Sequence, residues 1–419
     1  MLKKLRIKGF KSILDAEVEF GRVNLFIGGN GSGKSNILEA IGMLSAALSR
    51  DITETELQRK GVRLSVPTLF KSSFKNVTFG KTLTLNAEMN NSIKYDVSLA
   101  ASEENSTLIF FSEQVECGGN RVMGRSNNGI SVVGLDTGKK DIDRTRGIWD
   151  RFREVASVPE VLEMELNRVR EFNIYAPQTA FLRGEELESN PTKPLGLHGG
   201  GLPQAVHAVF SRRNRTKENK IAFDLSANII NLSWFPGWAS KIMVGPAALD
   251  SVSGRVKTGD ATLYFVDKFM REKRSHLSAY DSSEGTLYLL FVSVLLLHPE
   301  APKIFALDNV DNALNPAITR KMLETLIEAT CGAEYKKHNL GPDQVFLTSH
   351  NPTSLDAFDL FDDDQRVFVV SRSPDNGSTM ITRLKPNEGW TRADWVKAAG
   401  GKNLSELWIE DKIPGALGL

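Results

Sequence analysis

The stretch "VNLFIGGNGSGKSNILEAIGMLSAALS", residues 23–49, decides the fold that we expect for this chain. Residues 23–27 are apolar and predict a buried strand, whereas residues 36–49 carry apolar side chains at helical spacing. Between them, "GGNGSGKS" (28–35) satisfies the pattern G-x-x-x-x-G-K-[ST]. A strand that enters this loop and a helix that leaves it are the context that confirms a phosphate-binding loop.

The residue types of the loop suit a bound nucleotide. Glycines let the backbone wrap around phosphate oxygens, and the N–H groups at the start of the helix attract anions. We expect the Lys34 ammonium to reach the β- and γ-phosphates and the Ser35 hydroxyl to ligate Mg²⁺. The loop residues predicted to contact the nucleotide are Gly28, Asn30, Gly31, Ser32, Gly33, Lys34, Ser35 and Asn36.

The composition is that of an ordinary globular protein without an overall positive field. Apolar residues make up 41% and charged residues 25%, and 52 Lys and Arg against 51 Asp and Glu leave a net charge of +1. Any nucleic-acid surface must therefore be a local patch. Cys117 and Cys331 are far apart and have no CxxC pattern, which favours a reducing compartment. The start has no apolar signal core, and the apolar run 287–297 is too short for a bilayer, so we expect a cytoplasmic protein with no membrane partner.

The hydrophobic pattern predicts an α/β protein. Short alternating runs between residues 62 and 135 predict antiparallel strands, and residues 145–172 are helical in pattern. From residue 261 onward strands alternate with helices, which predicts a largely parallel sheet with helices on its faces. The segment 185–245 shows no clear pattern, and no heptad run is long enough for a coiled coil. We expect two ATPase lobes, 1–140 and 251–419, separated by a helical or irregular insertion, 141–250.

Three further motifs follow the phosphate loop in a fixed order: "YDSSEGTLYLLF" (280–291), "IFALDNVDNALNP" (304–316) and "VFLTSHNP" (345–352). Together the four motifs resemble SMC/RecF-like ATPases, the ABC-type heads of DNA repair and phage defence. The short signature and the tail "LSELWIEDKIPG" (404–415) are most similar to the OLD and Septu types of bacterial defence operons. The resemblance implies an ABC-type P-loop head with a mixed or parallel core sheet, an antiparallel β subdomain and a short helical insertion. It also implies ATP and Mg²⁺ as cofactors.

Ser283 and Gly285 stand where the family has its signature loop, at the start of a helix. They present a hydroxyl and a positive helix end to an anion. The resemblance implies that this anion is the γ-phosphate of ATP on another protomer, and hence a homodimer or a higher homo-oligomer. A serine followed by an acidic residue is also a common helix N-cap, so this structural reading stays open.

Asp308 ends an apolar strand, and the resemblance makes it the aspartate associated with Mg²⁺. Asn309 then occupies the position of the catalytic glutamate. An amide can hold a water but cannot accept its proton, so general-base catalysis worth about 10²–10⁴-fold in rate is lost. Asp311 is the nearest other carboxylate, although capping the turn or acting across the dimer explains it equally well. We expect tight ATP binding and slow hydrolysis.

Two more residues receive roles from the resemblance. His350 follows a strand and precedes a turn, so it lies at the carboxyl end of the sheet, and it is the expected γ-phosphate sensor. Gln178 follows the short apolar run "NIYAP" and is a candidate Q-loop ligand for the metal. A surface glutamine is at least as good an explanation of Gln178.

Two basic clusters, "RTRGIWDRFR" (144–153) and "SRRNRTKENK" (211–220), are candidates for contact with DNA or RNA, with Trp149 available to stack. Their interleaved acids equally suit solvated helix faces. No effector domain is evident in the sequence, so we expect a sensor or scaffold that controls a separate nuclease or toxin in anti-phage defence. The alternative is a RecF-like repair ATPase that acts directly on DNA. A metabolic P-loop enzyme such as a kinase is disfavoured by the signature and the switch histidine.

Overall fold

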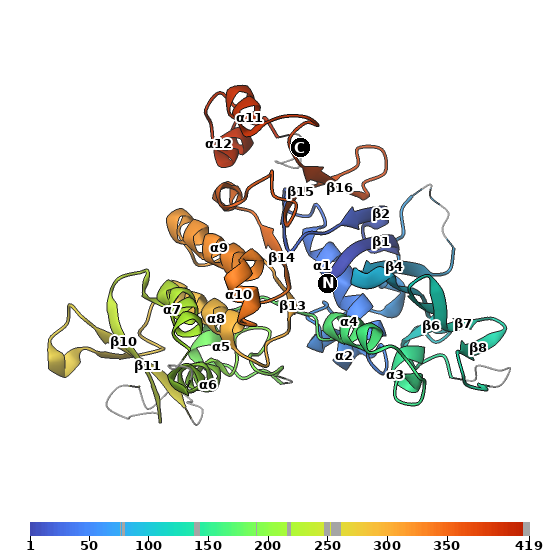
Figure 1. The fold of residues 1–419 in the computed structure, drawn as a ribbon, viewed down its shortest axis with the longest axis horizontal. Coiled ribbons are helices and arrows are strands. Elements are labelled where there is room, and N and C mark those ends of the chain that lie inside the picture. The colour runs from blue at the N-terminus through green and yellow to red at the C-terminus, as the bar shows by residue number, and fades with distance from the viewer. Residues whose placement is uncertain are drawn as a thin grey trace.

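The computed structural model describes residues 1–75, 77, 80–137, 143–189, 191–215, 219–246, 252 and 261–413 (Figure 1). Within these residues the strands form three sheets, of six, seven and three strands. The predicted domain limits at residues 140 and 250, part of the basic cluster 211–220 and the end of the tail 404–415 lie outside the described residues.

The six-stranded sheet is the core of the molecule. Its order is β16-β15-β3-β14-β13-β9, and every neighbouring pair is parallel except β15 and β16. The strands are β3 (Val23–Ile27), β9 (Asn173–Tyr175), β13 (Ile304–Leu307), β14 (Gln344–Ser349), β15 (Gln365–Arg372) and β16 (Thr379–Leu384). All residues of β3, β13 and β14 are buried. Strands that are buried along their whole length and largely apolar are typical of parallel sheets covered on both faces.

Alternate residues of these strands enter two separate hydrophobic cores. Leu25 of β3 and Leu347 of β14 pack into the core that contains α7 (Lys220–Trp234), α8 (Glu284–Leu297) and α9 (Pro316–Cys331). Their neighbours Phe26 and Phe346 pack into the other core, with α1 (Lys34–Ala47) and α4 (Glu160–Arg170). Because side chains alternate between the two faces of a strand, the two cores lie on opposite faces of the sheet, and helices cover both.

The seven-stranded sheet is antiparallel throughout and lies on the α1 side of the core sheet (Figure 1). Its order is β2-β1-β4-β5-β6-β7-β8. The strands are β1 (Leu2–Phe10), β2 (Ile13–Glu19), β4 (Leu83–Met89), β5 (Ile93–Ala101), β6 (Leu108–Cys117), β7 (Asn120–Ser126) and β8 (Gly129–Val132). A completely buried ion pair joins Glu113 of β6 to Arg125 of β7 at 2.8 Å, and the Tyr95 hydroxyl donates to the same carboxylate.

The segment without a clear sequence pattern contains α6 (Leu202–Arg215), α7 and β10 (Ala239–Gly245). Strand β10 pairs with β11 (Thr262–Asp267), which pairs with β12 (His276–Ser278), all antiparallel. The first strand after residue 261, where a largely parallel sheet was expected to begin, therefore belongs to a separate antiparallel sheet and not to the core. In Figure 1 this small sheet extends to the left, beyond α7 and α8.

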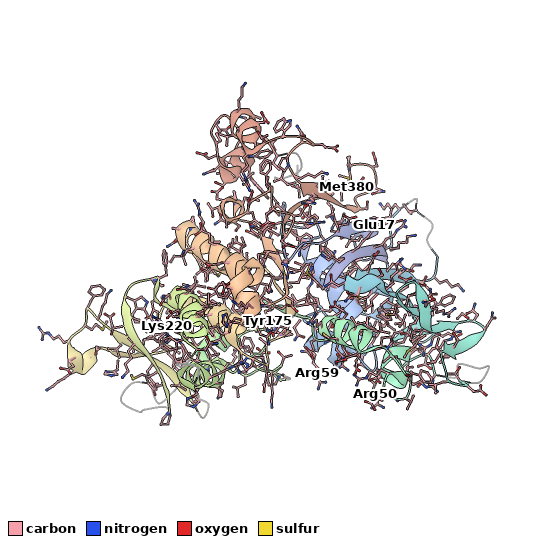
Figure 2. The ribbon with its side chains drawn as sticks, in the orientation of Figure 1. Glu17, Arg50, Arg59, Tyr175, Lys220 and Met380 are labelled. Carbon is pink, nitrogen blue, oxygen red and sulfur yellow. The ribbon has the colours of Figure 1, made fainter. Side chains whose placement is uncertain are left out.

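Short elements complete the chain. They are α2 (Glu54–Arg59), α3 (Ile148–Phe152), α5 (Thr179–Arg183), α10 (Ala333–Lys337), α11 (Arg392–Ala398), α12 (Leu404–Ile409) and the 3₁₀ turns Pro67–Phe70, Asn90–Ser92, Glu272–Arg274 and Pro352–Ala357. Figure 2 shows Tyr175, which is fully buried at the end of β9, near the middle of the molecule. None of the described helices is long and apolar enough to span a membrane.

The predicted fold class is confirmed: a mixed core sheet with helices on both faces carries an antiparallel β subdomain and a helical portion. The proposed role of Trp149 in stacking is wrong, because its ring has no exposed surface and packs in the core beneath the seven-stranded sheet. In the same basic cluster the half-buried Arg146 is paired with Asp150 at 2.9 Å, so part of its charge is neutralised within the cluster.

Candidate nucleotide site at the carboxyl edge of the core sheet

A cavity of about 310 Å³ opens at the carboxyl edge of the core sheet. It is lined by Asn30, Gly31, Gly33, Lys34, Ser35, Asn36, Arg63, Asn309, His350 and Arg372. Because β3, β13, β14 and β15 run parallel, their carboxyl ends meet at one edge, and residues distant in sequence come together there. The cavity therefore contains most of the predicted phosphate loop together with the predicted Asn309 and His350.

Lys34 lies at the centre of this site and is buried. Its ammonium donates to the carbonyl oxygens of Gly28 at 2.8 Å and Gly29 at 3.0 Å. Burial lowers the pKa of Lys34 to about 8, against the opposing effect of the carboxylates of Asp308 and Asp311. The lysine is folded back on its own loop, where a phosphate would offer it a stronger partner than two carbonyls.

Two loop glycines are required by their surroundings. Gly28 has φ 149°, and a Cβ there would lie 2.0 Å from the carbonyl oxygen of Val370. Gly33 has φ 111°, and its Cβ would lie 2.2 Å from the hydroxyl of Thr379 on β16. That hydroxyl donates to the carbonyl of Ser32 at 2.9 Å. The last strand pair of the sheet thus supports the loop from behind, and neither glycine can carry a side chain in this geometry.

Ser35 and Asp308 meet as the two predicted metal ligands. The Ser35 hydroxyl donates to both carboxylate oxygens of Asp308, at 3.1 and 3.2 Å. The hydroxyl of Thr348 on β14 also donates to Asp308 and fixes its orientation. A hydroxyl and a carboxylate beside a phosphate-binding loop are the oxygen ligands that Mg²⁺ takes in nucleotide sites, so these residues fit the ion.

Asn309 follows Asp308 and has φ 56°, the left-handed region that asparagine tolerates better than most residues. Its backbone N–H donates to the Thr348 hydroxyl at 2.8 Å, and the N–H of Val310 donates to the Thr348 carbonyl at 2.9 Å. Thr348 therefore holds Asp308 and Asn309 together, and Asn309 lines the cavity at the position where a general base is expected.

His350 lies 3.3 Å from the Lys34 ammonium, measured from its Nδ1. Burial lowers its pKa, and the positive charge of Lys34 lowers it further, so the imidazole is neutral at pH 7. A neutral ring offers Nδ1 as an acceptor to the ammonium. Asp311 is close enough for its charge to oppose the pKa shifts of Lys34 and His350, and among the described residues its buried Oδ1 has no hydrogen-bond partner.

Ser283 and Gly285 lie outside this cavity. Ser283 caps α8, because its hydroxyl accepts from the Thr286 N–H at 3.2 Å, as the structural reading of the motif predicted. A Cβ on Gly285 would lie 3.1 Å from the Ala313 carbonyl, so the start of α8 packs against the turn that follows Asp311. The cap leaves Ser283 exposed, and its role toward a second protomer stays a prediction.

Gln178 is exposed and its amide lies 3.4 Å from Nδ1 of His198. The described residues include no hydrogen bond from Gln178 to Ser35 or Asp308. Gln178 nevertheless follows β9, whose last residue, Tyr175, lies at the same edge of the sheet as Asp308. The Asp308 N–H donates to the Tyr175 carbonyl at 2.9 Å. The metal role of Gln178 stays a prediction.

Sequence reasoning missed three residues of the site: Arg63, Thr348 and Arg372. Arg63 donates to the side chain of Asn36 at 3.0 Å and is ion-paired with Glu39 on α1. Arg372 donates from Nε to the Gly31 carbonyl at 2.8 Å. Arg372 is the last residue of β15 and Thr348 the last but one of β14, both at the edge that carries the phosphate loop, which is a usable signal. Arg63 lies in an irregular segment after α2 and carries no such signal.

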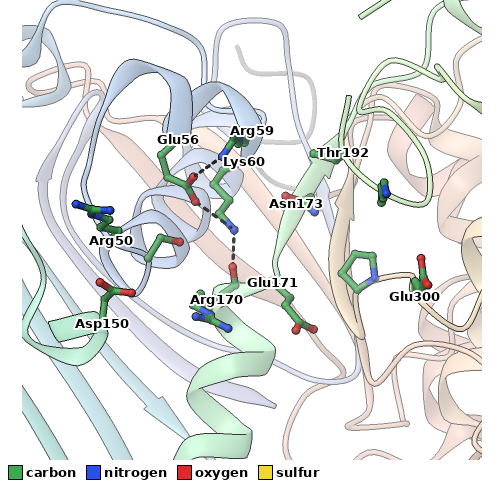
Figure 3. Close-up of a pocket in the computed structure, with 13 residues that line it drawn as sticks. Arg50, Glu56, Arg59, Lys60, Asp150, Arg170, Glu171, Asn173, Thr192 and Glu300 are labelled. Carbon is green, nitrogen blue, oxygen red and sulfur yellow. Dashed lines mark hydrogen bonds and ion pairs between the residues drawn. The ribbon is translucent and has the colours of Figure 1, made fainter. Parts of the chain in front are cut away.

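A larger cavity of about 500 Å³ lies elsewhere and shares no lining residue with the nucleotide site (Figure 3). It lies between α2, the end of α4 and the start of β9. There Lys60 is 3.7 Å from Glu56 and also donates to the Arg170 carbonyl. The Lys60 ammonium thus has its hydrogen-bonding and charge partners within the protein. The residues suited to phosphate binding line the smaller cavity.

The fold and the site define a P-loop ATPase. Residues 135–356, more than half of the chain, match the family model described as "AAA domain, putative AbiEii toxin, Type IV TA system", and the chain belongs to that family. Residues 1–143 match the AAA ATPase domain.

Relatives of known identity resemble the chain in part. Over 62 residues it is 45% identical to the DNA replication and repair protein RecF of Magnetococcus marinus, and this match covers 14% of the chain and 16% of that protein. Among solved structures, the SMC head domain from Thermotoga maritima is 16% identical with a TM-score of 0.43, and 92% of the chain covers 99% of it. The recombination mediator protein RecF–ATP of the RecFOR pathway is 13% identical with a TM-score of 0.39, at the same coverage.

Proposed function

We propose that this ATPase is of the SMC/RecF-like ABC type and closes into a homodimer around ATP and Mg²⁺. The observation that carries the proposal is the meeting of two contacts at one cavity: Lys34 lies 3.3 Å from His350, and the Ser35 hydroxyl, which lines the same cavity, donates to Asp308. In the dimer, Ser283 and Gly285 of one protomer contact the γ-phosphate held by the other.

Each residue has a defined task in this proposal. Lys34 exchanges its loop carbonyls for the β- and γ-phosphates, and Ser35 and Asp308 hold the metal. The metal ion supplies neutralisation of phosphate charge. Thr348 keeps Asp308 in place, and His350 accepts a hydrogen bond from Lys34 or from a water beside the γ-phosphate. Asn309 orients that water but cannot take its proton, so hydrolysis is slow.

Slow hydrolysis suits a sensor or scaffold better than an enzyme of metabolism. We propose that the ATP-closed dimer controls a separate effector, a nuclease or a toxin, in anti-phage defence of the OLD or Septu type. The proposal is supported by Asn309 in place of a glutamate, by the resemblance of the signature and the tail, and by the net charge of +1. The protein would act in the cytoplasm.

Two measurements test this function. Light scattering of the purified chain should show a dimer with ATP and Mg²⁺ but not with ADP. Lys34→Ala removes the ammonium that contacts the phosphates, so this variant should stay monomeric. Co-expression with the product of the adjacent gene should yield a stoichiometric complex whose nuclease or toxin activity depends on ATP. A chain that stays monomeric with ATP, or that turns over faster than about 1 s⁻¹, the low end of ordinary enzymes, contradicts the proposal.

A second function is favoured by the local identity to a RecF protein. In that case the chain is a repair ATPase that binds DNA directly. ATP-dependent DNA binding by the purified chain alone, with no complex formed with a neighbouring gene product, would favour repair over the sensor.

A further inference from the structure

The turn between β11 and β12, residues 268–274 with the sequence KFMREKR, is here named the basic tip. All seven residues are exposed, and they carry four cations and one anion, a net charge of +3. Phe269 is 78% exposed and Met270 47% exposed. In Figure 1 the turn lies at the outer left edge of the molecule, away from the core sheet. Two adjacent large apolar side chains exposed among cations make this turn a candidate interaction surface.

The basic tip has a defined conformation although it is exposed. The Asp267 N–H donates to the Ser275 carbonyl at 2.8 Å and closes the turn. The Phe269 N–H donates to the Asp267 carboxylate at 2.7 Å, and the Arg274 N–H donates to the Arg271 carbonyl at 2.7 Å. The turn thus holds the Phe269 ring in solvent, at the cost of leaving an aromatic side chain without a core to pack in.

A cation lies over that ring, and further basic side chains follow on the neighbouring strands. The Lys268 ammonium lies 5.0 Å from the centroid of the Phe269 ring. Two more basic side chains, Lys241 on β10 and His276 on β12, are exposed and stand opposite Val266 in the register of the two flanking strands. Exposed basic side chains therefore continue from the basic tip onto both flanking strands.

We propose that the basic tip binds single-stranded nucleic acid. Its cations contact the phosphates, and Phe269 stacks on an unpaired base, the pairing of forces that single-strand binders use. Bases in a duplex are already stacked on each other, so an exposed ring favours a single strand. An acidic protein partner would use the cations but not the isolated aromatic ring.

The basic tip is joined to the signature motif by a chain of contacts. The Lys268 N–H donates to the Trp238 carbonyl at 3.1 Å, and the Trp238 indole donates to the Thr286 hydroxyl at 3.0 Å. The Thr286 hydroxyl in turn lies 2.8 Å from the hydroxyl of Ser283. Nucleic acid is then the signal that the ATPase senses, a conclusion that rests on the proposed function, whereas the binding itself does not.

Binding is tested with the full-length chain and a fluorescein-labelled 30-nucleotide oligothymidine, by anisotropy without nucleotide at several salt concentrations. Changing Lys268, Arg271 and Lys273 together to Ala should lower the slope of log affinity against log salt by about 2, or about 0.7 for each lost phosphate contact. Phe269→Ala should weaken binding by about 5- to 150-fold, the loss of one stacked base, and leave the slope unchanged.

Matched controls keep the test specific. Changing Lys3, Lys94 and Arg121 to Ala removes three exposed cations from the seven-stranded sheet, and Leu187→Ala removes a side chain that is 83% exposed. Both should bind like the wild type, and thermal melting and ATP binding should be unchanged in every variant. If the tip variants bind the oligonucleotide as the wild type does, the proposal is wrong even where the ATP-dependent dimer forms.

Two further outcomes also overturn the proposal. Equal affinity for a 30-base-pair duplex with no effect of Phe269→Ala would exclude stacking. Binding to vesicles with 30% phosphatidylserine that depends on Phe269, without binding to the oligonucleotide, would make the basic tip a lipid-binding surface. Conversely, oligonucleotide binding at the tip without an ATP-dependent dimer would support the tip and refute the proposed dimer.

Discussion

Replacing Asn309 is the sharpest test of why this ATPase should be slow. The side chain lines the nucleotide cavity, and its backbone is fixed by the Thr348 hydroxyl at 2.8 Å. A carboxylate there would face the same water and could take its proton. We expect Asn309→Glu to raise the hydrolysis rate by about 10²–10⁴-fold, the usual worth of a general base. At 1.36 kcal/mol for each factor of ten, that is a barrier lowered by about 3–5 kcal/mol.

The backbone sets the cost of that substitution. At φ 56° a residue other than Gly, Asn or Asp is strained by about 1–2 kcal/mol, so Asn309→Glu should also lower the free energy of unfolding by about that amount. Asn309→Asp avoids the strain but has a shorter reach, and Asn309→Gln has the length of glutamate without its basicity.

The assay is single-turnover hydrolysis of radiolabelled ATP at saturating protein with Mg²⁺, alongside light scattering to confirm the dimer. Asn309→Gln and Asp311→Ala should hydrolyse ATP at the wild-type rate. The reasoning is refuted if Asn309→Glu binds ATP and dimerises but stays within about threefold of the wild type, or if Asp311→Ala abolishes the activity. The second result would make Asp311, with its unpartnered Oδ1, the base.

Three further predictions follow from the pKa shift, the helix cap and the buried ion pair. Burial holds the pKa of Lys34 at about 8 in the free protein, and the protonated ammonium is the form that binds phosphate. ATP affinity, measured by calorimetry from pH 7 to 9.5, should therefore be constant below pH 8 and fall about tenfold for each pH unit above it. A flat profile contradicts this prediction. Ser283→Gly removes the hydroxyl but costs the α8 cap only a few tenths of a kcal/mol, so the ATP-dependent dimer should weaken while ATP binding by the monomer is retained. Glu113→Gln leaves the Arg125 guanidinium buried without its anion, and should lower the free energy of unfolding by about 3–5 kcal/mol, as measured by urea titration. An unchanged urea midpoint would show that other groups compensate the buried charge of Arg125.

The nucleotide site was accessible from the sequence because its signals are local. The largely apolar run 23–27, the glycine loop and the helix after it are contiguous, and Asp308 and His350 each directly follow a run of buried residues. Parallel pairing then brings such strand ends to one edge. Thr348 stands at the same strand end, but a threonine inside a strand is ordinarily interpreted as a packed structural residue, so the sequence did not mark it as part of the site.

The rest depended on contacts that no local pattern encodes. The strand at 262–267 has the composition of a core strand, but its partners β10 and β12 are chosen by tertiary packing. Trp149 stands in a basic stretch that predicts exposure, yet its ring is buried, and Arg151 is exposed beside it. Arg63 reaches the site through tertiary contacts with Glu39 and Asn36 of α1.

The free energy that nucleic acid can supply at the basic tip can be compared with the free energy needed to close the dimer. A switch that moves the dimer from about 1% to 99% closed needs a ligand that favours the closed state by about 10⁴-fold, or about 5.5 kcal/mol. One stacked base is worth about 1–3 kcal/mol, so a single Phe269 is too weak to switch the dimer. Two tips together reach about 2–6 kcal/mol, and phosphate contacts add to this.

The dimer should therefore respond fully only when both basic tips are occupied. A heterodimer with Phe269→Ala in one protomer, isolated by two affinity tags, should show a partial shift toward the closed state with saturating oligonucleotide, and the doubly substituted dimer almost none. Trp238→Phe keeps the ring against Phe265 but removes the donor to Thr286, so it should bind the oligonucleotide normally and fail to close. If Trp238→Phe closes as the wild type does, the contact chain does not carry the signal, and the basic tip binds nucleic acid without informing the ATPase.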